Sequence, residues 1–250
     1  MLIAADTAVR INKGENRMIK LYNENFMDSI HNYTDATIVT DPPYNINFKY
    51  GEYDDNQSKD EYIDMISRFK GLKTCIIHYP EETMKYIVPA LGVPDEVNVW
   101  CYNSNLPGRQ SRLINYYGVV PDYNKVKQPY KNPNDKRIKQ RIADGSTGTR
   151  SYDWFSDIQL VKNVSKKKYP HPCPVPVKLM ERIILLTTNI GDTIIDPFMG
   201  SGTTAIACLN TGREFVGFEI DTAYFDVAQE RVNDKLMEMV KENEINNRNC

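Results

Sequence analysis

Residues 192–209 predict a strand, a glycine turn and a helix in succession, and this unit limits the fold more than any other stretch. The run 192–196 (DTIID) has the character of a buried strand, and an apolar helical pattern begins just after Gly200-Ser201-Gly202. Glycines let the backbone approach a ligand where a Cβ would collide, and the N-terminus of the next helix favours a carboxylate or phosphate. The unit therefore predicts an α/β fold with a ligand at the carboxyl end of this strand.

A second strand is predicted at 213–219, and it ends in Glu219. An acid at the end of the strand after a glycine-rich turn is placed to bind ribose hydroxyls. The turn is neither the dinucleotide fingerprint nor a P-loop, because it lacks the third glycine and the following Lys that these motifs require. The combination of Asp196, Phe198, the two glycines and Glu219 is more informative than the glycines alone.

The segment 41–44 (DPPY) joins a carboxylate, two prolines and an aromatic ring directly after a buried strand predicted at 36–40. Two prolines fix φ and remove two N–H donors, so the local carbonyls are free to accept hydrogen bonds from a ligand. Such a cluster can hold and polarise an amino group on a flat ring, with Tyr44 as a stacking face. The alternative is that the prolines simply end a strand and Asp41 forms a turn.

Apolar runs alternate with helical patterns along the chain, as in a doubly wound sheet. Between 103 and 164 the periodicity fades, and prolines and glycines indicate loops and short strands, so this segment is an insertion by composition. The predicted strands are 17–22, 36–40, 74–78, 96–101, 192–196 and 213–219, and the predicted helices are 59–69, 81–90, 176–188 and one after Glu219.

These motifs together resemble the amino-group DNA methyltransferases that use S-adenosylmethionine, in the β arrangement, in which the catalytic motif precedes the cofactor motif. The catalytic DPPY motif at 41–44 and the cofactor loop DPFMGSGTT at 196–204 are almost unaltered, and the likeness covers roughly 17–53 and 153–233. Two positions depart from the family pattern: Val175 replaces a common Lys, and Asn25 replaces a common acid.

The resemblance implies an α/β fold, with a Rossmann-like, doubly wound, mostly parallel sheet of seven strands. It implies a single methyltransferase domain over 1–250, with a catalytic half at 17–103, a basic target-recognition insertion at 104–165 and a cofactor half at 166–240.

The resemblance also assigns roles to residues. Asp41 and the Pro42 carbonyl would accept the two amine hydrogens, with Pro43 and Tyr44 completing the catalytic motif and Tyr44 stacking on a base flipped out of the duplex. The residues expected to bind S-adenosylmethionine are Asn25, His171, Asp196, Phe198, Gly200, Ser201, Gly202, Thr203, Thr204 and Glu219. For His171, a loop residue fixed by neighbouring prolines is an equal alternative.

Charge is unevenly distributed along the chain. The net charge is −2, yet residues 104–178 hold 15 Lys and Arg against 5 Asp, and the remainder is strongly acidic. Because tyrosines and Trp154 interleave with these basic residues, the segment suits phosphate contact and base stacking rather than only a solvated loop. The residues expected to contact DNA are Arg109, Arg112, Lys125, Lys127, Lys131, Arg137, Lys139 and Arg141.

Composition disfavours several classes of protein. The five cysteines form no Cys-x-x-Cys pair and there are only three histidines, so no metal is expected. No apolar run approaches the roughly 20 residues that cross a bilayer, and no signal peptide is recognisable. With the resemblance, this predicts a cytoplasmic protein of a prokaryotic cell or its phage, with double-stranded DNA as partner and no membrane, either alone or as a homodimer.

Three kinds of function remain open at this point. Adenine-N6 methylation of DNA leads, because family members that act on cytosine-N4 more often open the catalytic motif with Ser. Methylation of RNA or of a protein amide uses related motifs, although the basic insertion disfavours protein. A non-catalytic binding subunit is disfavoured by the intact Asp41 and Tyr44. The recognised base sequence cannot be read from the chain.

Overall fold

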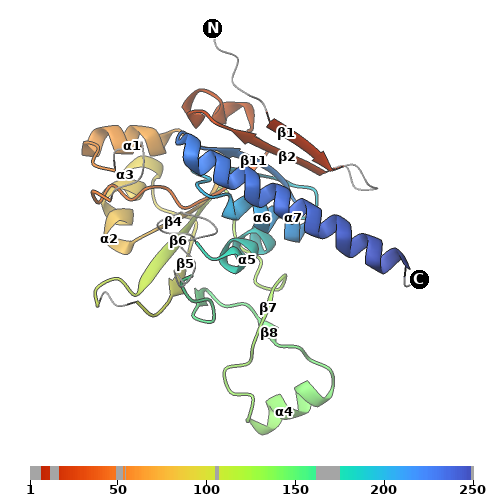
Figure 1. Cartoon of the computed structure of the whole chain (residues 1–250). Helices are drawn as coiled ribbons and strands as arrows, with labels where there is room; N and C mark the ends of the chain where they lie inside the picture. Colours follow the sequence, from red (N-terminus) through yellow and green to blue (C-terminus); the bar gives the residue numbers. More distant parts are fainter. Residues whose placement is uncertain are drawn as a thin grey trace.

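The computed structural model describes residues 7–11, 17–48, 53, 55–104, 107–161 and 175–248. A nine-stranded sheet crosses the body of the protein (Figure 1). Its strands are β1 (Thr7–Ile11), β2 (Arg17–Tyr22), β3 (Thr37–Thr40), β4 (Lys73–His78), β5 (Glu96–Cys101), β6 (Ser111–Tyr117), β9 (Trp154–Phe155), β10 (Thr193–Asp196) and β11 (Glu214–Phe218). Their order across the sheet is β1-β2-β11-β10-β3-β4-β6-β5-β9.

The centre of the sheet is parallel. Strands β2, β11, β10, β3 and β4 pair in parallel, whereas β6 runs antiparallel to both β4 and β5. The seven strands from β2 to β5 form the predicted doubly wound, mostly parallel, Rossmann-like sheet, and this fold class is confirmed. The antiparallel β1 and the two-residue β9 extend its two edges, so the sheet has nine strands rather than seven.

Helices cover both faces of the sheet, because successive side chains of a strand point to opposite faces. Ile77 and Ile194 belong to one buried cluster, while their neighbours Ile76 and Ile195 belong to the other. The first cluster is covered by α5 (Val177–Thr187), α6 (Thr203–Thr211) and α7 (Thr222–Arg248). The second is covered by η1 (Phe26–Asp28), η2 (Ile30–Asn32), α1 (Lys59–Ser67), η3 (Thr83–Ile87) and α3 (Val88–Leu91). The short α2 (Pro80–Glu82) precedes η3 and buries no residue.

Strand β6 lies inside the segment that the sequence assigns to an insertion. It pairs with β4 from Thr74↔Tyr117 to His78↔Leu113, and so belongs to the main sheet. The strand was missed because two of its buried positions are polar, Arg112 and Asn115, which breaks the apolar pattern of a strand. The predicted boundary at 104 therefore separates β6 from the sheet to which it belongs.

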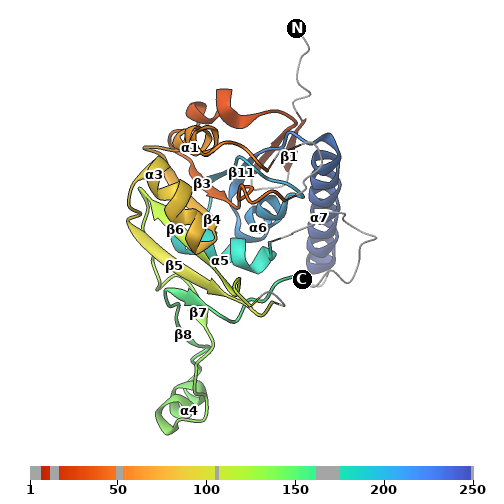
Figure 2. The ribbon, with the colours of Figure 1, turned by 90° about the vertical axis from the view of Figure 1, so that its left-hand side faces the viewer.

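The part of the insertion that leaves the body is narrower. Strands β7 (Lys127–Gln128) and β8 (Thr149–Arg150) form a two-stranded antiparallel stem, and α4 (Lys136–Ala143) lies between them in sequence. Figures 1 and 2 show this hairpin projecting away from the sheet with α4 at its tip. We call residues 127–150 the arm.

Candidate functional site

The two sequence motifs meet at the carboxyl edge of the sheet. Strands β3 and β10 are parallel neighbours, with Ile38 opposite Ile195, so the residues that follow each strand lie side by side. The Thr40 hydroxyl donates a hydrogen bond of 2.7 Å to Asp196. Asp41 is close enough to Asp196 to raise its pKa. Segments some 155 residues apart in sequence therefore form one site.

A cavity of about 1170 Å³ opens at this edge and is lined by both motifs. The lining residues expected from the sequence are Asn25, Asp41, Pro43, Tyr44, Arg109, Arg112, Asp196, Phe198, Gly200, Ser201, Thr203, Thr204 and Glu219. Gly202 does not line it. That residue starts α6 in a left-handed conformation (φ 76°) and packs against Ala228 of α7. A space of this size is larger than that of a typical single-ligand pocket.

Asp196 is fixed within the wall of the cavity rather than exposed to it. It is 3% exposed and accepts hydrogen bonds from Thr40, from the Thr204 hydroxyl and from the Phe198 N–H. Burial raises its pKa to about 6, although these three donors oppose the shift. Asp196 thus ties the end of β10 to β3 and to the first turn of α6.

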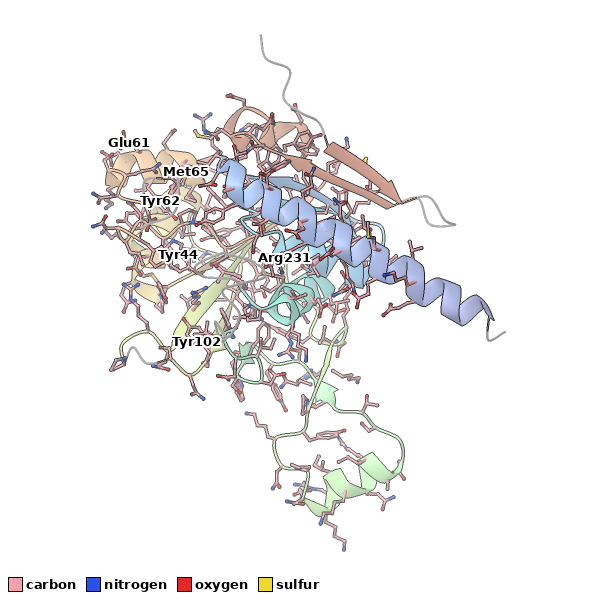
Figure 3. The ribbon with its side chains drawn as sticks, in the orientation of Figure 1. Tyr44, Glu61, Tyr62, Met65, Tyr102 and Arg231 are labelled. Carbon is pink, nitrogen blue, oxygen red and sulfur yellow. The ribbon has the colours of Figure 1, made fainter. Side chains whose placement is uncertain are left out.

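Glu219 holds the glycine turn from the neighbouring strand. One carboxylate oxygen accepts the Gly200 N–H at 2.9 Å, and the other accepts the Asp221 N–H at 2.9 Å. Burial raises the pKa of Glu219 to about 7, against the lowering effect of these two hydrogen bonds. Arg231 of α7, labelled in Figure 3, supports the same turn by donating to the Ser201 carbonyl and hydroxyl.

Of the two remaining residues expected to bind the cofactor, Asn25 and His171, only Asn25 belongs to the described residues. Asn25 lines the cavity, and its side-chain oxygen caps η1 by accepting the Met27 N–H at 3.0 Å. Val175, where the family commonly has Lys, also lines the cavity and is buried. His171 lies outside the described residues.

The catalytic motif is held by residues that the sequence did not single out. The Tyr62 hydroxyl of α1 donates to the Pro43 carbonyl at 2.5 Å and lies 3.1 Å from His78 Nε2. His78 is buried, which lowers its pKa to about 3 and keeps it neutral. Within the described chain, no backbone N–H donates to the Pro42 carbonyl. Pro42 is buried and is not among the residues that line the cavity, unlike Asp41, Pro43 and Tyr44. The two proline carbonyls therefore differ: that of Pro43 anchors the motif, and that of Pro42 accepts no backbone hydrogen bond.

The loop after the motif is anchored by Asp55, which was also missed. This carboxylate is 2% exposed and accepts the N–H groups of Asn45, Ile46 and Phe48 at 2.7, 3.2 and 2.9 Å. Asn45 adopts a positive φ of 55° and exchanges two hydrogen bonds with Gln57. No short-range pattern could reveal this contact, because the acid follows the motif by about ten residues of loop.

Asp41 is engaged within the cavity. It forms an ion pair of 3.2 Å with Arg112 of β6 and accepts a hydrogen bond from the Tyr44 hydroxyl. Burial raises the pKa of Asp41, while Arg112 and the Tyr44 hydrogen bond lower it. The Tyr44 ring is buried, 4.4 Å from the His78 ring between centroids.

The residues expected to contact DNA are not all in one place. Arg112 is buried at 8% exposure, and Arg109 lies over the Tyr79 ring beside the cavity. Lys125 is tied to the body by hydrogen bonds to Thr188 and Asn189. The other expected residues are exposed on the arm: Lys127, Lys131, Arg137, Lys139 and Arg141.

Two further classes of site are absent from the part of the chain that is described. It contains no cluster of three or more His, Cys, Asp or Glu side chains arranged to hold a metal ion. None of its helices combines the length and apolar character that a membrane span requires.

Comparison with known proteins identifies relatives. The model of a DNA methylase family (N6_N4_Mtase) matches residues 36–230. The type II methyltransferase M.HpaI of Haemophilus parainfluenzae is 29% identical over 213 residues, which cover 78% of this chain and 67% of that protein. The type II methyltransferase M.BglII of Bacillus subtilis is 28% identical over 247 residues, covering 84% and 67%.

Solved structures show the same fold. The M1.HpyAVI–SAM complex has a TM-score of 0.59 at 24% identity and covers 86% of this chain and 100% of that one. The cytosine-N4-specific PvuII DNA methyltransferase has a TM-score of 0.57 at 15% identity and covers 89% and 92%.

Proposed function

Because this chain belongs to the N6/N4 family of DNA methylases, we propose that it transfers the methyl group of S-adenosylmethionine to N6 of adenine in DNA. The observation that carries the proposal is the meeting of the two motifs in one cavity. Asp41, an acceptor for an amine, lies in the same wall as Asp196, and Glu219 and the glycine turn complete the cavity. The cavity is large enough for a nucleoside cofactor and one flipped base together.

The cofactor half of the cavity suits S-adenosylmethionine. Glu219 would accept the ribose hydroxyls, and the N-terminus of α6 would face the methionine carboxylate. When bound, the cofactor supplies an electrophilic methyl group on a sulfonium. The residues that would hold it are Asn25, Asp196, Phe198, Gly200, Ser201, Thr203, Thr204 and Glu219, with His171 as a further candidate. Gly202 would act only by shaping the turn that starts α6.

The catalytic half would activate the amine. An exocyclic adenine amine is a poor nucleophile because its lone pair is delocalised into the ring. Asp41 and the Pro42 carbonyl would accept its two hydrogens, which draws the nitrogen toward tetrahedral geometry and stabilises positive charge as it develops. Pro43 fixes the motif through Tyr62, and the Tyr44 ring would stack on the base.

Substitution of Asp41 by Ala tests this proposal. We expect methyl transfer from labelled S-adenosylmethionine to unmethylated bulk DNA to fall at least about 100-fold, since the acceptor is lost, while cofactor affinity measured by calorimetry changes little. Asp35→Ala, which removes an exposed carboxylate just before β3, is the control and should keep full activity. Unchanged turnover in the Asp41→Ala protein would exclude the assigned role.

Adenine rather than cytosine is favoured by the aspartate that opens the catalytic motif. Cytosine-N4 methylation is the second candidate, since an enzyme of that specificity shares the fold. Nucleosides from DNA treated with the protein and cofactor, separated by mass spectrometry, should contain N6-methyladenine. N4-methylcytosine without methylated adenine would overturn the assignment, and transfer to RNA alone would redirect it to another polymer.

A further inference from the structure

Arg112 is the most unusual charged group of the cavity. It extends from strand β6, between β4 and β5, its side chain is 10% exposed, and it pairs with the carboxylate of Asp41 at 3.2 Å. Its guanidinium lies within 5.2–5.8 Å of four aromatic ring centroids, those of Tyr44, Tyr79, Trp100 and Tyr102. Burial lowers the pKa of Arg112, but the surrounding acidic groups outweigh this and raise it well above its ordinary value, so the group stays charged.

The partners of this guanidinium are those that a flipped base requires. A guanidinium is flat, carries N–H donors in its plane and stacks on aromatic faces, as an amino-substituted base does. Asp41 is the acceptor assigned to the amine, and Tyr44 is the ring assigned to base stacking. Both are engaged by Arg112 here. The base and the guanidinium therefore compete for the same groups.

Their charges indicate that the Arg112 guanidinium and the reacting amine of the base cannot both be bound to Asp41 during methyl transfer. As the amine nitrogen bonds to the methyl carbon, it gains positive charge before it loses a proton. A cation held on the same carboxylate would oppose that charge in a buried, weakly screened site. Arg112 is also imperfectly bonded, since its Nε has no hydrogen-bond partner among the described residues. These features suit a group that is released when the base enters.

We propose that the Arg112 guanidinium occupies the target-base pocket in the DNA-free enzyme and that the flipped base displaces it from Asp41 and the aromatic rings. The proposal rests on the proposed function, because it takes Asp41 as the acceptor for the amine. Until a base enters, Arg112 keeps Asp41 paired and opposes the rise in its pKa that burial causes.

Nucleoside binding measures this competition directly. Calorimetric titration with 2′-deoxyadenosine, in the presence of S-adenosylmethionine, should give at least tenfold tighter binding to Arg112→Met than to the wild type. The titration is run at pH 8 and pH 9, because loss of Arg112 raises the pKa of Asp41. Agreement between the two values excludes protonation of Asp41 as the cause. Equal or weaker binding by Arg112→Met would overturn the proposal, since a residue that assists the base loses affinity when removed.

Arg182→Met is the matched control. Arg182 also pairs with a carboxylate, that of Asp157, and lies 5.0 Å from an aromatic ring centroid, that of Phe155. It does not line the cavity, so its substitution should change nucleoside affinity less than twofold. An equal gain in nucleoside affinity in Arg112→Met and Arg182→Met would mean that the loss of any such ion pair loosens the fold and favours binding, and would count against the proposal.

A second measurement does not depend on a variant of unknown stability. In wild-type protein labelled with ¹⁵N-arginine, the Nε–H resonance of Arg112 should shift toward that of free arginine on saturation with 2′-deoxyadenosine. An unmoved resonance at saturation would reject displacement. Labelled methyl transfer by the wild type to bulk DNA tests the proposed function separately. Transfer combined with an unmoved resonance rejects only the displacement, whereas a moved resonance without transfer rejects only the assigned reaction.

Discussion

At the scale of single residues, the site contains three buried carboxyl groups with different electrostatic settings. Asp41 has a cation beside it, whereas Asp196 and Glu219 are held by neutral donors alone. Hydrogen bonds from hydroxyl and backbone groups offset only part of the burial effect, so the pKa values of Asp196 and Glu219 rise to about 6 and about 7. Two carboxyl groups on the cofactor side of the cavity therefore have pKa values close to neutral pH.

Glu219 predicts a dependence of stability on pH. Its pKa of about 7 in the folded chain exceeds the ordinary value of 4.5, so the folded state binds a proton more tightly. Its contribution therefore favours folding at acidic pH and is lost as the pH rises through about 7. Between pH 6 and 8, the free energy of unfolding should fall by about 1 kcal/mol more in the wild type than in Glu219→Gln, as measured by urea denaturation. Parallel pH profiles of the two proteins would contradict the assignment.

The hydrogen bond from the Tyr62 hydroxyl to the Pro43 carbonyl predicts that this hydroxyl affects turnover. Tyr62→Phe leaves the partly buried Pro43 carbonyl and the buried His78 Nε2 without this partner, which should lower the free energy of unfolding by about 1–3 kcal/mol. Because the catalytic motif loosens, kcat should fall more than cofactor affinity. Tyr86→Phe is the control, since the Tyr86 ring packs against Tyr62 outside this hydrogen-bond network. A similar loss of kcat in both proteins would argue against the network.

At the scale of elements, apolar periodicity predicts most of the sheet correctly. The strand at 96–101 has the predicted bounds, and the strands ending at Tyr22, Thr40 and His78 end where predicted. Strand β6 was missed because Arg112 and Asn115 replace apolar residues at buried positions. The contacts of Tyr62 and Asp55 with the catalytic loop could not be predicted either, because they join elements whose spatial relation only the fold determines.

Ala substitutions at Gly202 and Gly191 separate two destabilising effects of an added Cβ, which are steric overlap with a neighbour and backbone strain at positive φ. A Cβ on Gly202 would lie 3.1 Å from the Ala228 Cβ, whereas at Gly191, which has a similar φ of 85°, no described atom lies within 4 Å. Gly191→Ala should lower the free energy of unfolding by about 1 kcal/mol through the left-handed backbone alone. Gly202→Ala should lower it by about 1–2 kcal/mol more, measured by urea denaturation, and should weaken cofactor binding. Equal losses of unfolding free energy in Gly191→Ala and Gly202→Ala would show that α7 moves away from the added Cβ with no further loss of stability.

At the scale of the whole molecule, we propose that the arm contacts DNA and that none of its residues takes part in the chemistry, because none lines the cavity. Its helix α4 has no buried residue, so its basic side chains contribute little to folding. Each Lys or Arg that neutralises a phosphate steepens the salt dependence of DNA affinity by about 0.9 in a log–log plot. The residues to be changed together to Ala are Arg137, Lys139 and Arg141.

We expect this triple variant to bind bulk duplex DNA more weakly and to reduce that slope by about 2–3. Its cofactor affinity should equal that of the wild type. The matched control replaces three exposed lysines elsewhere on the body, Lys70, Lys73 and Lys241, and should leave the slope unchanged. An identical slope in the wild type and the arm variant, obtained from fluorescence anisotropy over a range of salt, would refute contact between α4 and DNA.

The pairing of β3 with β10 has a consequence for the order of events during synthesis. The ribosome completes Asp41 long before Asp196, so the early half of the chain emerges with the edge of β3 unpaired. Contacts between residues so distant in sequence form late and slow folding. A nascent chain can therefore have no methyl-transfer activity until Asp196 and Glu219 have left the exit tunnel, and the unpaired β3 edge makes it prone to aggregation in the interval.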